Sequence, residues 1–248
     1  MQTKYLKIEL TKEDIELLLS RYHFKDTDFF KVSALYQTLL PLLRTEAAYV
    51  RKEQTNEIAE KEFFIVFLTL GKLVDELQDL YSENECVSEA YMIECLAMEL
   101  LKKAYEEAVR EIQKESGKWV AALEFLGDRY PLELLPELEK EVGQTKITYN
   151  ENFVLSPRKS VVMLLPVTDS QVEEVCHICT NCGNVNCSYR EKKREEVFRE
   201  RDEKYRDGER RAGTDREGTD QMKTKKAVPY GYQRIFGKKA EDGEEYEK

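Results

Sequence analysis

The stretch Phe63-Phe-Ile-Val-Phe-Leu-Thr-Leu70 (FFIVFLTL), followed by Gly71, is the longest apolar run in the chain. A strand that is covered on both faces has no polar alternation, so this run predicts a central, fully buried β-strand that ends at the glycine. It is far shorter than the roughly 18 apolar residues that a membrane-spanning helix needs. We therefore expect no membrane association.

The segments on either side of this strand predict a mixture of helices and further strands. Thr11 precedes Lys-Glu-Asp and an apolar helical face, which is typical of a capped helix start. The predicted helices cover residues 11–19, 28–43, 72–81, 88–114 and 132–142, and the predicted strands cover residues 5–10, 47–52, 62–70, 146–153 and 160–166. Because strands and helices are segregated along the chain, they favour an α+β fold with a mixed or antiparallel sheet and packed helices.

The charge of the 248 residues is unevenly distributed. The whole chain has a net charge of -10, and residues 188–248 hold 18 Lys and Arg against 16 Asp and Glu. Residues 1–187 therefore hold 21 basic against 33 acidic residues, a net charge of -12. An acidic body argues against nucleic-acid binding, which needs a surplus of Lys and Arg. The start of the chain lacks a signal-peptide pattern, which favours a cytoplasmic protein.

The composition divides the chain into three units. We predict an α+β body over residues 1–170, a cysteine-rich segment over residues 171–190 and a charged tail over residues 191–248. From Glu191 to Lys226 the tail has too few apolar residues to offset the entropy of ordering, so it is expected to be solvated, with helix formation in its first half. Pro229–Gly237 (PYGYQRIFG) interleaves aromatic and turn residues and is interpreted as a short docking element.

Four of the six cysteines lie within twelve residues. Cys176, Cys179, Cys182 and Cys187 follow the pattern C-x2-C-x2-C-x4-C. In a chain without a signal peptide, such dense cysteines predict metal-binding thiolates rather than disulfides. Four thiolates suit either a [4Fe–4S] cluster or tetrahedral zinc. The spacing of the first three cysteines resembles bacterial ferredoxin runs, which favours iron–sulfur over zinc, although the x4 spacing before the fourth cysteine and the missing proline depart from that pattern.

The remaining chemistry-bearing residues predict no self-contained catalytic site. Cys95 falls on the apolar face of the long predicted helix and is interpreted as a small core residue. The chain has only two histidines, and it lacks phosphate-binding glycine loops and the hydrolase and metalloprotease motifs. Composition and spacing alone thus indicate a metal-binding α+β protein.

Three groups of segments resemble the activation domain of vitamin B12-dependent methionine synthase, and in particular its short stand-alone bacterial relatives. The first is Phe67-Leu-Thr-Leu-Gly71 with Val74-Asp75 and the helix around Tyr91–Ala97; the second is Gly127-Asp128 with Pro131–Leu134; the third is Leu155–Val161 with the finish Cys179-x2-Cys182-x4-Cys187-Ser-Tyr189-Arg190. The similarity extends over roughly residues 45–190.

This resemblance implies a role beside a cobalamin cofactor that a partner protein holds. In that family the activation domain binds S-adenosylmethionine next to the corrinoid, and reduction plus methyl transfer rescues the inactive cob(II) state. The implied partner is a corrinoid-dependent methyltransferase or methionine synthase. One departure matters: the family's Pro-Gly-Tyr donor segment is replaced by Leu123-Glu-Phe-Leu126 before Gly127, so the resemblance assigns no S-adenosylmethionine contact there.

Three functions therefore remain open at the level of the sequence. The first is an accessory factor for reactivating a corrinoid methyltransferase, with or without electron delivery from the cysteine site. The second is a redox or metal-binding protein that uses the same scaffold for another partner. In the third, a structural zinc site ties the tail to the body.

Overall fold

The predicted central strand is the middle of the sheet in the computed structural model, which describes residues 1–53, 62–127, 130–143 and 145–172. The strands are β1 Gln2–Tyr5, β2 Glu46–Glu53, β3 Glu62–Thr69, β4 Trp119–Val120, β5 Glu124–Phe125, β6 Thr148–Tyr149, β7 Leu155–Ser156 and β8 Ser160–Thr168. The main sheet has the order β1-β2-β3-β8-β4, and β5 also pairs with β8. All of these pairs are antiparallel.

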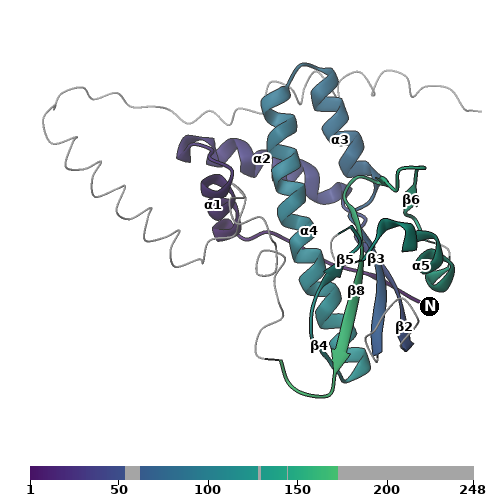
Figure 1. Ribbon diagram of the computed structural model, residues 1–248. Coiled ribbons are helices and arrows are strands. Elements are labelled where there is room, and N and C mark those ends of the chain that lie inside the picture. Colours follow the sequence, from purple (N-terminus) through teal and green to yellow (C-terminus); the bar gives the residue numbers. More distant parts are fainter. Residues whose placement is uncertain (54–61, 128–129, 144, 173–248) are drawn as a thin grey trace, which may run out of the picture.

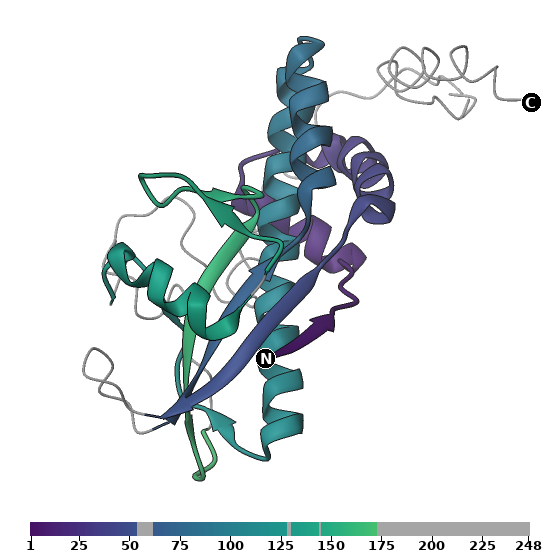
Figure 2. The ribbon, with the colours of Figure 1, turned by 90° about the vertical axis from the view of Figure 1, so that its right-hand side faces the viewer.

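Helices cover one face of this sheet and a smaller layer covers the other. The α-helices are α1 Lys12–Arg21, α2 Phe29–Leu39, α3 Lys72–Glu83, α4 Val87–Ser116 and α5 Leu135–Val142, with short 3-10 turns at Asp26–Asp28, Leu40–Leu42 and Leu132–Leu134. Figures 1 and 2 show α4 along one side of the sheet, with α5 and the β6–β7 hairpin on the opposite side. The architecture is therefore α+β with an antiparallel sheet, which confirms the predicted fold class.

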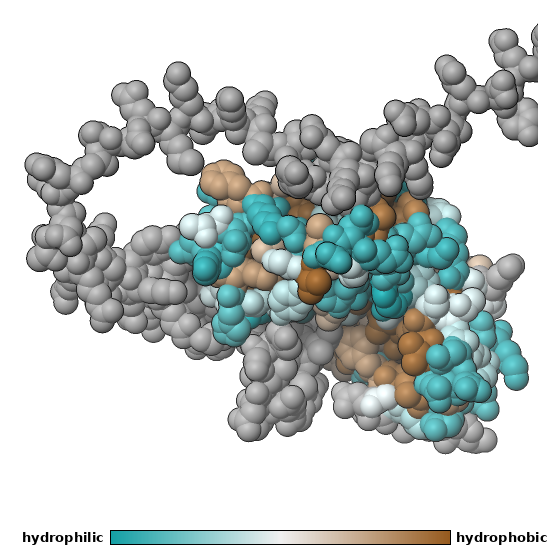
Figure 3. All heavy atoms as spheres, turned by 90° about the horizontal axis from the view of Figure 1, so that it is seen from above, coloured by the Kyte–Doolittle hydropathy of each residue, from teal (hydrophilic) through white to brown (hydrophobic). Residues whose placement is uncertain are grey.

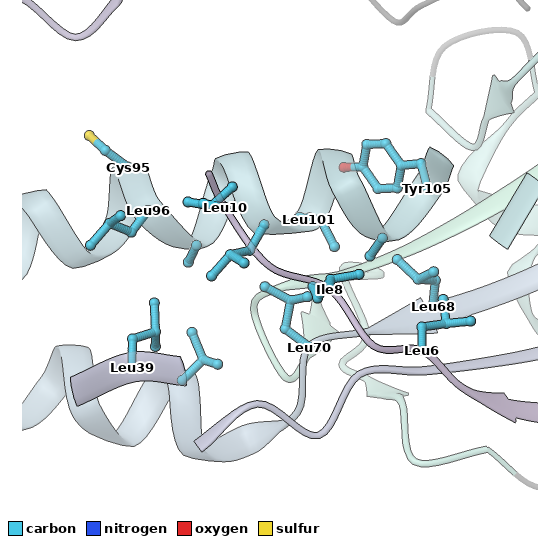
Figure 4. Packing of buried hydrophobic residues seen from close by; sticks show 14 of the residues in the cluster. Leu6, Ile8, Leu10, Leu39, Leu68, Leu70, Cys95, Leu96, Leu101 and Tyr105 are labelled. Carbon is cyan, nitrogen blue, oxygen red and sulfur yellow. The ribbon is translucent and has the colours of Figure 1, made fainter. Parts of the chain in front are cut away.

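The alternation of side chains along β3 explains why its sequence is apolar throughout. Phe64, Val66 and Leu68 belong to the core between the sheet and the helices α1–α4, whereas Phe63, Ile65 and Phe67 belong to the core under α5. Successive residues of a strand point to opposite faces, so a strand between two cores must be apolar at every position. Figure 4 shows the first of these cores, where Leu68 and Leu70 face Leu6, Ile8 and Leu101.

Several helix predictions are confirmed. Thr11 caps α1 with a capping box, because its side chain accepts from the Asp14 backbone while the Asp14 carboxylate accepts from the Thr11 backbone. Cys95 is buried in the core, as predicted. The inward face of α4 is broader than the predicted stripe, and Tyr91 lies outside it with 41% of its surface exposed. The predicted second helix ends early, at Leu39, and a 3-10 turn that contains Pro41 follows it.

The predicted opening strand is wrong for most of its length. β1 ends at Tyr5, although Leu6, Ile8 and Leu10 are buried in alternation as the pattern required. The Leu10 backbone N–H donates to the Tyr36 hydroxyl on α2 at 2.8 Å instead of to a neighbouring strand. The alternation thus reflects an extended segment that packs under helices.

The strand predicted over residues 146–153 is also wrong, since only Thr148–Tyr149 pairs there. The Asn150 side chain accepts from the backbone of Asn152 and Val154 and turns the chain into the β6–β7 hairpin. The two-residue strands β4 and β5 had no sequence signal. The predicted unit boundaries at residues 170 and 190 stay predictions, because residues 173–248 lie outside the described part.

Candidate functional site

The predicted metal ligands Cys176, Cys179, Cys182 and Cys187 lie outside the described residues. Within the described residues, no group of three or more His, Cys, Asp or Glu side chains is arranged to hold a metal ion. Burial raises the pKa of the Cys95 thiol to about 12, so this side chain is a neutral thiol at ordinary pH. Its burial is in line with the predicted role as a small core residue.

At one end of the sheet the structure brings together the end of β3, residues of α3 and α4 and the start of β8. We call this group the strand-end cluster: Thr69, Asp75, Glu94, Arg158, Lys159 and Ser160. β3 ends and β8 begins here, and the two strands pair directly, with Thr69 opposite Ser160. Residues up to 91 positions apart in the sequence thus share one site.

The sheet side of the cluster is held by Thr69, which is 2% exposed. Its hydroxyl oxygen accepts from the Ser160 hydroxyl at 2.8 Å and from the Gly71 backbone N–H at 3.1 Å. Gly71 has φ +94°, and a Cβ atom there would lie 2.8 Å from Cβ of Arg44, so the position requires glycine. The Thr-Leu-Gly sequence therefore forms a tight link between β3 and α3.

The helix side of the cluster consists of two ion pairs. Lys159 is 6% exposed and its ammonium lies 2.8 Å from the Glu94 carboxylate on α4. The Arg158 backbone N–H donates to Asp75 Oδ2 at 2.6 Å, and its guanidinium donates to Asp79 at 2.6 Å. The hydrogen bond to Asp79 raises the pKa of Arg158, which keeps this side chain charged. The start of β8 is thereby fixed to both α3 and α4.

A polar row continues from the cluster across the whole sheet. Tyr5 lies opposite Glu46, Glu46 opposite Thr69, and Thr69 opposite Ser160. Directly opposed residues share a face, so this row lies on the α5 side of the sheet. Glu46 is 6% exposed, and its carboxylate accepts from the Lys146 ammonium at 2.5 Å. The same ammonium lies 4.9 Å from the centre of the Tyr5 ring.

The segment that replaces the family's donor motif is part of the sheet. Glu124 and Phe125 form β5, which pairs with Leu164 and Met163 of β8. The Glu124 side chain is buried and accepts from the Tyr130 hydroxyl at 3.0 Å. The Gly127 N–H donates to the Tyr130 carbonyl at 2.7 Å, while Asp128 lies outside the described residues. Glu124 is therefore engaged inside the protein.

These contacts define what the cluster can do chemically. Its cations are paired with carboxylates, and Asp75 Oδ1 is a buried oxygen without a hydrogen bond, 3.6 Å from Nε of Arg158. Paired and buried charges fix geometry and do not offer a free nucleophile. The arrangement therefore fixes the ends of β3 and β8 against α3 and α4.

Most residues of the cluster lie in segments quoted for the resemblance, although the sequence assigned them no role, and the residues Glu46, Lys146 and Tyr5 of the adjoining polar row were missed. Glu46 directly precedes the predicted strand over residues 47–52, yet its neighbours across the sheet become known only from the strand register. The signal that the sequence offers is a carboxylate directly before an apolar strand, where a charged side chain is buried only if it is paired.

Comparisons with known proteins find a likeness in structure. No family model and no curated protein matches the chain. The chain is similar to a crystal structure of the MetH reactivation domain bound to AdoHcy, with a TM-score of 0.46 and 12% sequence identity over 72% of this chain and 82% of that one. At this score the likeness concerns the course of the chain, and nothing about ligands or activity follows from it. Among the described residues, no helix is both long and apolar enough to cross a membrane.

Proposed function

We propose that this protein is an accessory factor that supports the reactivation of a corrinoid-dependent methyltransferase. The observation that carries the proposal is the strand-end cluster. Parts of the first and third groups of segments quoted for the resemblance to the methionine synthase activation domain are linked there through Thr69–Ser160, Asp75–Arg158 and Glu94–Lys159. This juxtaposition supports the proposal that these parts serve one binding surface.

The proposed role is to present a rigid protein surface to the corrinoid of the partner. In the reaction that the resemblance implies, cob(II)alamin takes up one electron and the methyl group of S-adenosylmethionine, which gives methylcobalamin and S-adenosylhomocysteine. The source of the electron is proposed to be a [4Fe–4S] cluster on the four cysteines. The proposal assigns no methyl-donor contact to residues 123–126, because Glu124 and Phe125 form β5 where the family has its donor segment.

Titration of the anaerobically purified full chain with cob(II)alamin tests the proposal. Saturable binding is expected, seen as a change in the electron paramagnetic resonance and absorption spectra of the corrinoid. Parallel calorimetric titrations with S-adenosylmethionine and S-adenosylhomocysteine separate the two forms of the proposal. Binding of the corrinoid without the donor indicates a partner protein that lacks methyl transfer of its own, whereas absence of saturable corrinoid binding contradicts the proposal.

The second proposal concerns the metal, and its test compares cysteine variants. Cys179→Ser and Cys182→Ser are expected to lower the content of bound metal, measured by elemental analysis, because each removes one of the four proposed thiolate ligands. Cys95→Ser is the matched control, since Cys95 is a buried neutral thiol, and it should keep the metal content of the natural chain.

The absorption spectrum decides between the metals. Broad absorption near 400 nm together with iron and sulfide indicates an iron–sulfur cluster. A colourless protein that contains zinc favours the alternative, a structural zinc site without electron delivery. Unchanged metal content in both cluster variants would overturn the metal proposal and leave the corrinoid proposal untouched.

A further inference from the structure

An apolar surface lies at the end of the molecule where α2 and α4 begin. Val87 and Tyr91 are one helical turn apart on α4, and they are 70% and 41% exposed. The Phe24 ring packs against Tyr91 with centroids 5.6 Å apart. We call Phe24, Val87 and Tyr91 the α4-start patch. Figure 3 looks down on this end of the molecule and shows hydrophobic residues exposed among hydrophilic ones.

Acidic side chains surround the patch in the sequence. Residues 22–31 and 81–91 contain five carboxylates, Asp26, Asp28, Glu83, Glu85 and Glu89, against the two cations Lys25 and Lys31. The Lys31 ammonium lies 2.8 Å from Glu89 and so connects the start of α2 to the start of α4. Phe30, next to Lys31, is 83% exposed. The net charge of these two segments is -3, so an apolar and basic ligand suits this end of the protein.

The chain itself contains such a ligand. Residues 221–240 (QMKTKKAVPYGYQRIFGKKA) hold six Lys and Arg and no Asp or Glu. The same stretch carries Tyr230, Tyr232, Ile235 and Phe236 between the cations. Aromatic side chains contribute large contact areas, and the cations that flank them complement the net negative charge of residues 22–31 and 81–91, which we call the acidic rim.

The length of the chain permits this contact. Asp169, near the end of the described residues, forms an ion pair with Lys118 just beyond the end of α4. The patch lies at the other end of α4, whose 30 residues span about 45 Å. The 48 residues 173–220 have a contour length on the order of 160 Å, more than three times that distance.

We propose that residues 221–240 dock on the α4-start patch of the same molecule. The apolar contacts with Val87, Tyr91 and Phe24 contribute affinity, and the attraction between the six cations and the acidic rim orients the segment. Because both partners belong to one chain, docking proceeds at a high effective concentration and needs only modest intrinsic affinity. This inference does not depend on the corrinoid proposal.

Photo-crosslinking in the full chain tests the proposal. The probe p-benzoylphenylalanine replaces Val87 in one variant and Val154 in a matched control, since Val154 is 59% exposed on the β6–β7 turn. Mass spectrometry of tryptic peptides is expected to show crosslinks from position 87 to residues 221–240 within one chain. We expect an excess of about tenfold over position 154, the ratio that roughly 1.4 kcal/mol of preference gives.

Two further measurements keep the test decisive. The triple change Lys223→Glu, Lys225→Glu and Lys226→Glu should lower the crosslink yield from position 87, as should raised salt, because both weaken the charge attraction. A probe at Phe236 should in turn label residues 24–31 or 83–91. Crosslinks from position 87 that join two chains, that map elsewhere, or that equal those from position 154 would overturn the proposal.

Discussion

Replacement of Leu68 by alanine is expected to lower the free energy of unfolding by about 3–4 kcal/mol. Leu68 is fully buried in the middle of the sheet and belongs to the core between β3 and the helices. The loss combines the transfer free energy of the removed methyl groups with the cavity that remains, because the strands on both sides hold the backbone of β3 in place. Denaturant unfolding followed by circular dichroism measures the change.

Leu132→Ala is the control for this prediction, because Leu132 is 38% exposed. The same atoms are removed there from a half-solvated position, so the expected loss is below about 1 kcal/mol. Equal losses at the two positions would mean that β3 is not the centre of the core. A changed slope of the unfolding curve would instead indicate an altered unfolded or native state.

The apolar run Phe63–Leu70 predicted the centre of the fold because its side chains pack into both hydrophobic cores of the molecule. The pattern of β3 admits no exposed face, and the helices that follow it have clear boundaries: Gly71 precedes α3, and Gly117, in the left-handed conformation, ends α4. Physical features that act over a few residues, such as caps and periodicity, are visible in a sequence. The class of fold and the central strands were accordingly predicted.

The strand predictions fail where a residue far away in the sequence decides which hydrogen bonds the backbone forms. Leu6–Leu10 has a strand pattern, but the backbone N–H of Leu10 donates to the Tyr36 hydroxyl. The backbone N–H of Leu6 donates to the Thr45 carbonyl. No local pattern reveals such a competition. β4 and β5 likewise form by pairing with the free edge of β8. Short strands of this kind depend on the completed sheet.

In the candidate site, too, the sequence reveals local features but not the contacts between distant residues. Thr69 and Ser160 lie in segments that the sequence singled out, yet their hydrogen bond depends on a strand register that joins β3 to β8. Glu46 and Lys146 were missed because they are 100 residues apart and meet only across the folded sheet. The four-cysteine site stays a prediction, because its residues lie outside the described part of the chain.

Glu99→Gln is expected to lower the free energy of unfolding by about 2–3 kcal/mol at neutral pH, since it removes the carboxylate charge that pairs with the largely buried Arg21. The Glu99 carboxylate on α4 lies within 2.6 Å of the Arg21 guanidinium at the end of α1, and the side chains of both residues are only 13% exposed. It also accepts from the Tyr22 hydroxyl at 3.0 Å and from Lys102 at 3.1 Å. This network fixes α1 to α4.

The pH dependence gives the prediction a second readout. Burial alone would raise the pKa of Glu99, but the charges and hydrogen bonds of Lys102 and Arg21 outweigh it and hold this pKa below the ordinary value of 4.5. The unfolded chain therefore takes up a proton before the folded one does. The contribution of Glu99 is fully present above about pH 4.5 and is lost as the pH falls through the folded pKa. Unfolding curves of the natural chain and of Glu99→Gln should thus converge in acid.

Glu107→Gln on the same helix is the matched control. Glu107 pairs with Arg110 at 3.0 Å, but the Arg110 side chain is 64% exposed, so water replaces the lost partner. The expected cost is below about 0.5 kcal/mol, as is usual for surface ion pairs. Should Glu99→Gln cost no more than Glu107→Gln, or should its deficit persist unchanged well below pH 4, the attraction between Glu99 and Arg21 would not be what holds α1 against α4. Convergence of the curves in acid, with a large difference at neutral pH, is the result that this buried charge pair requires.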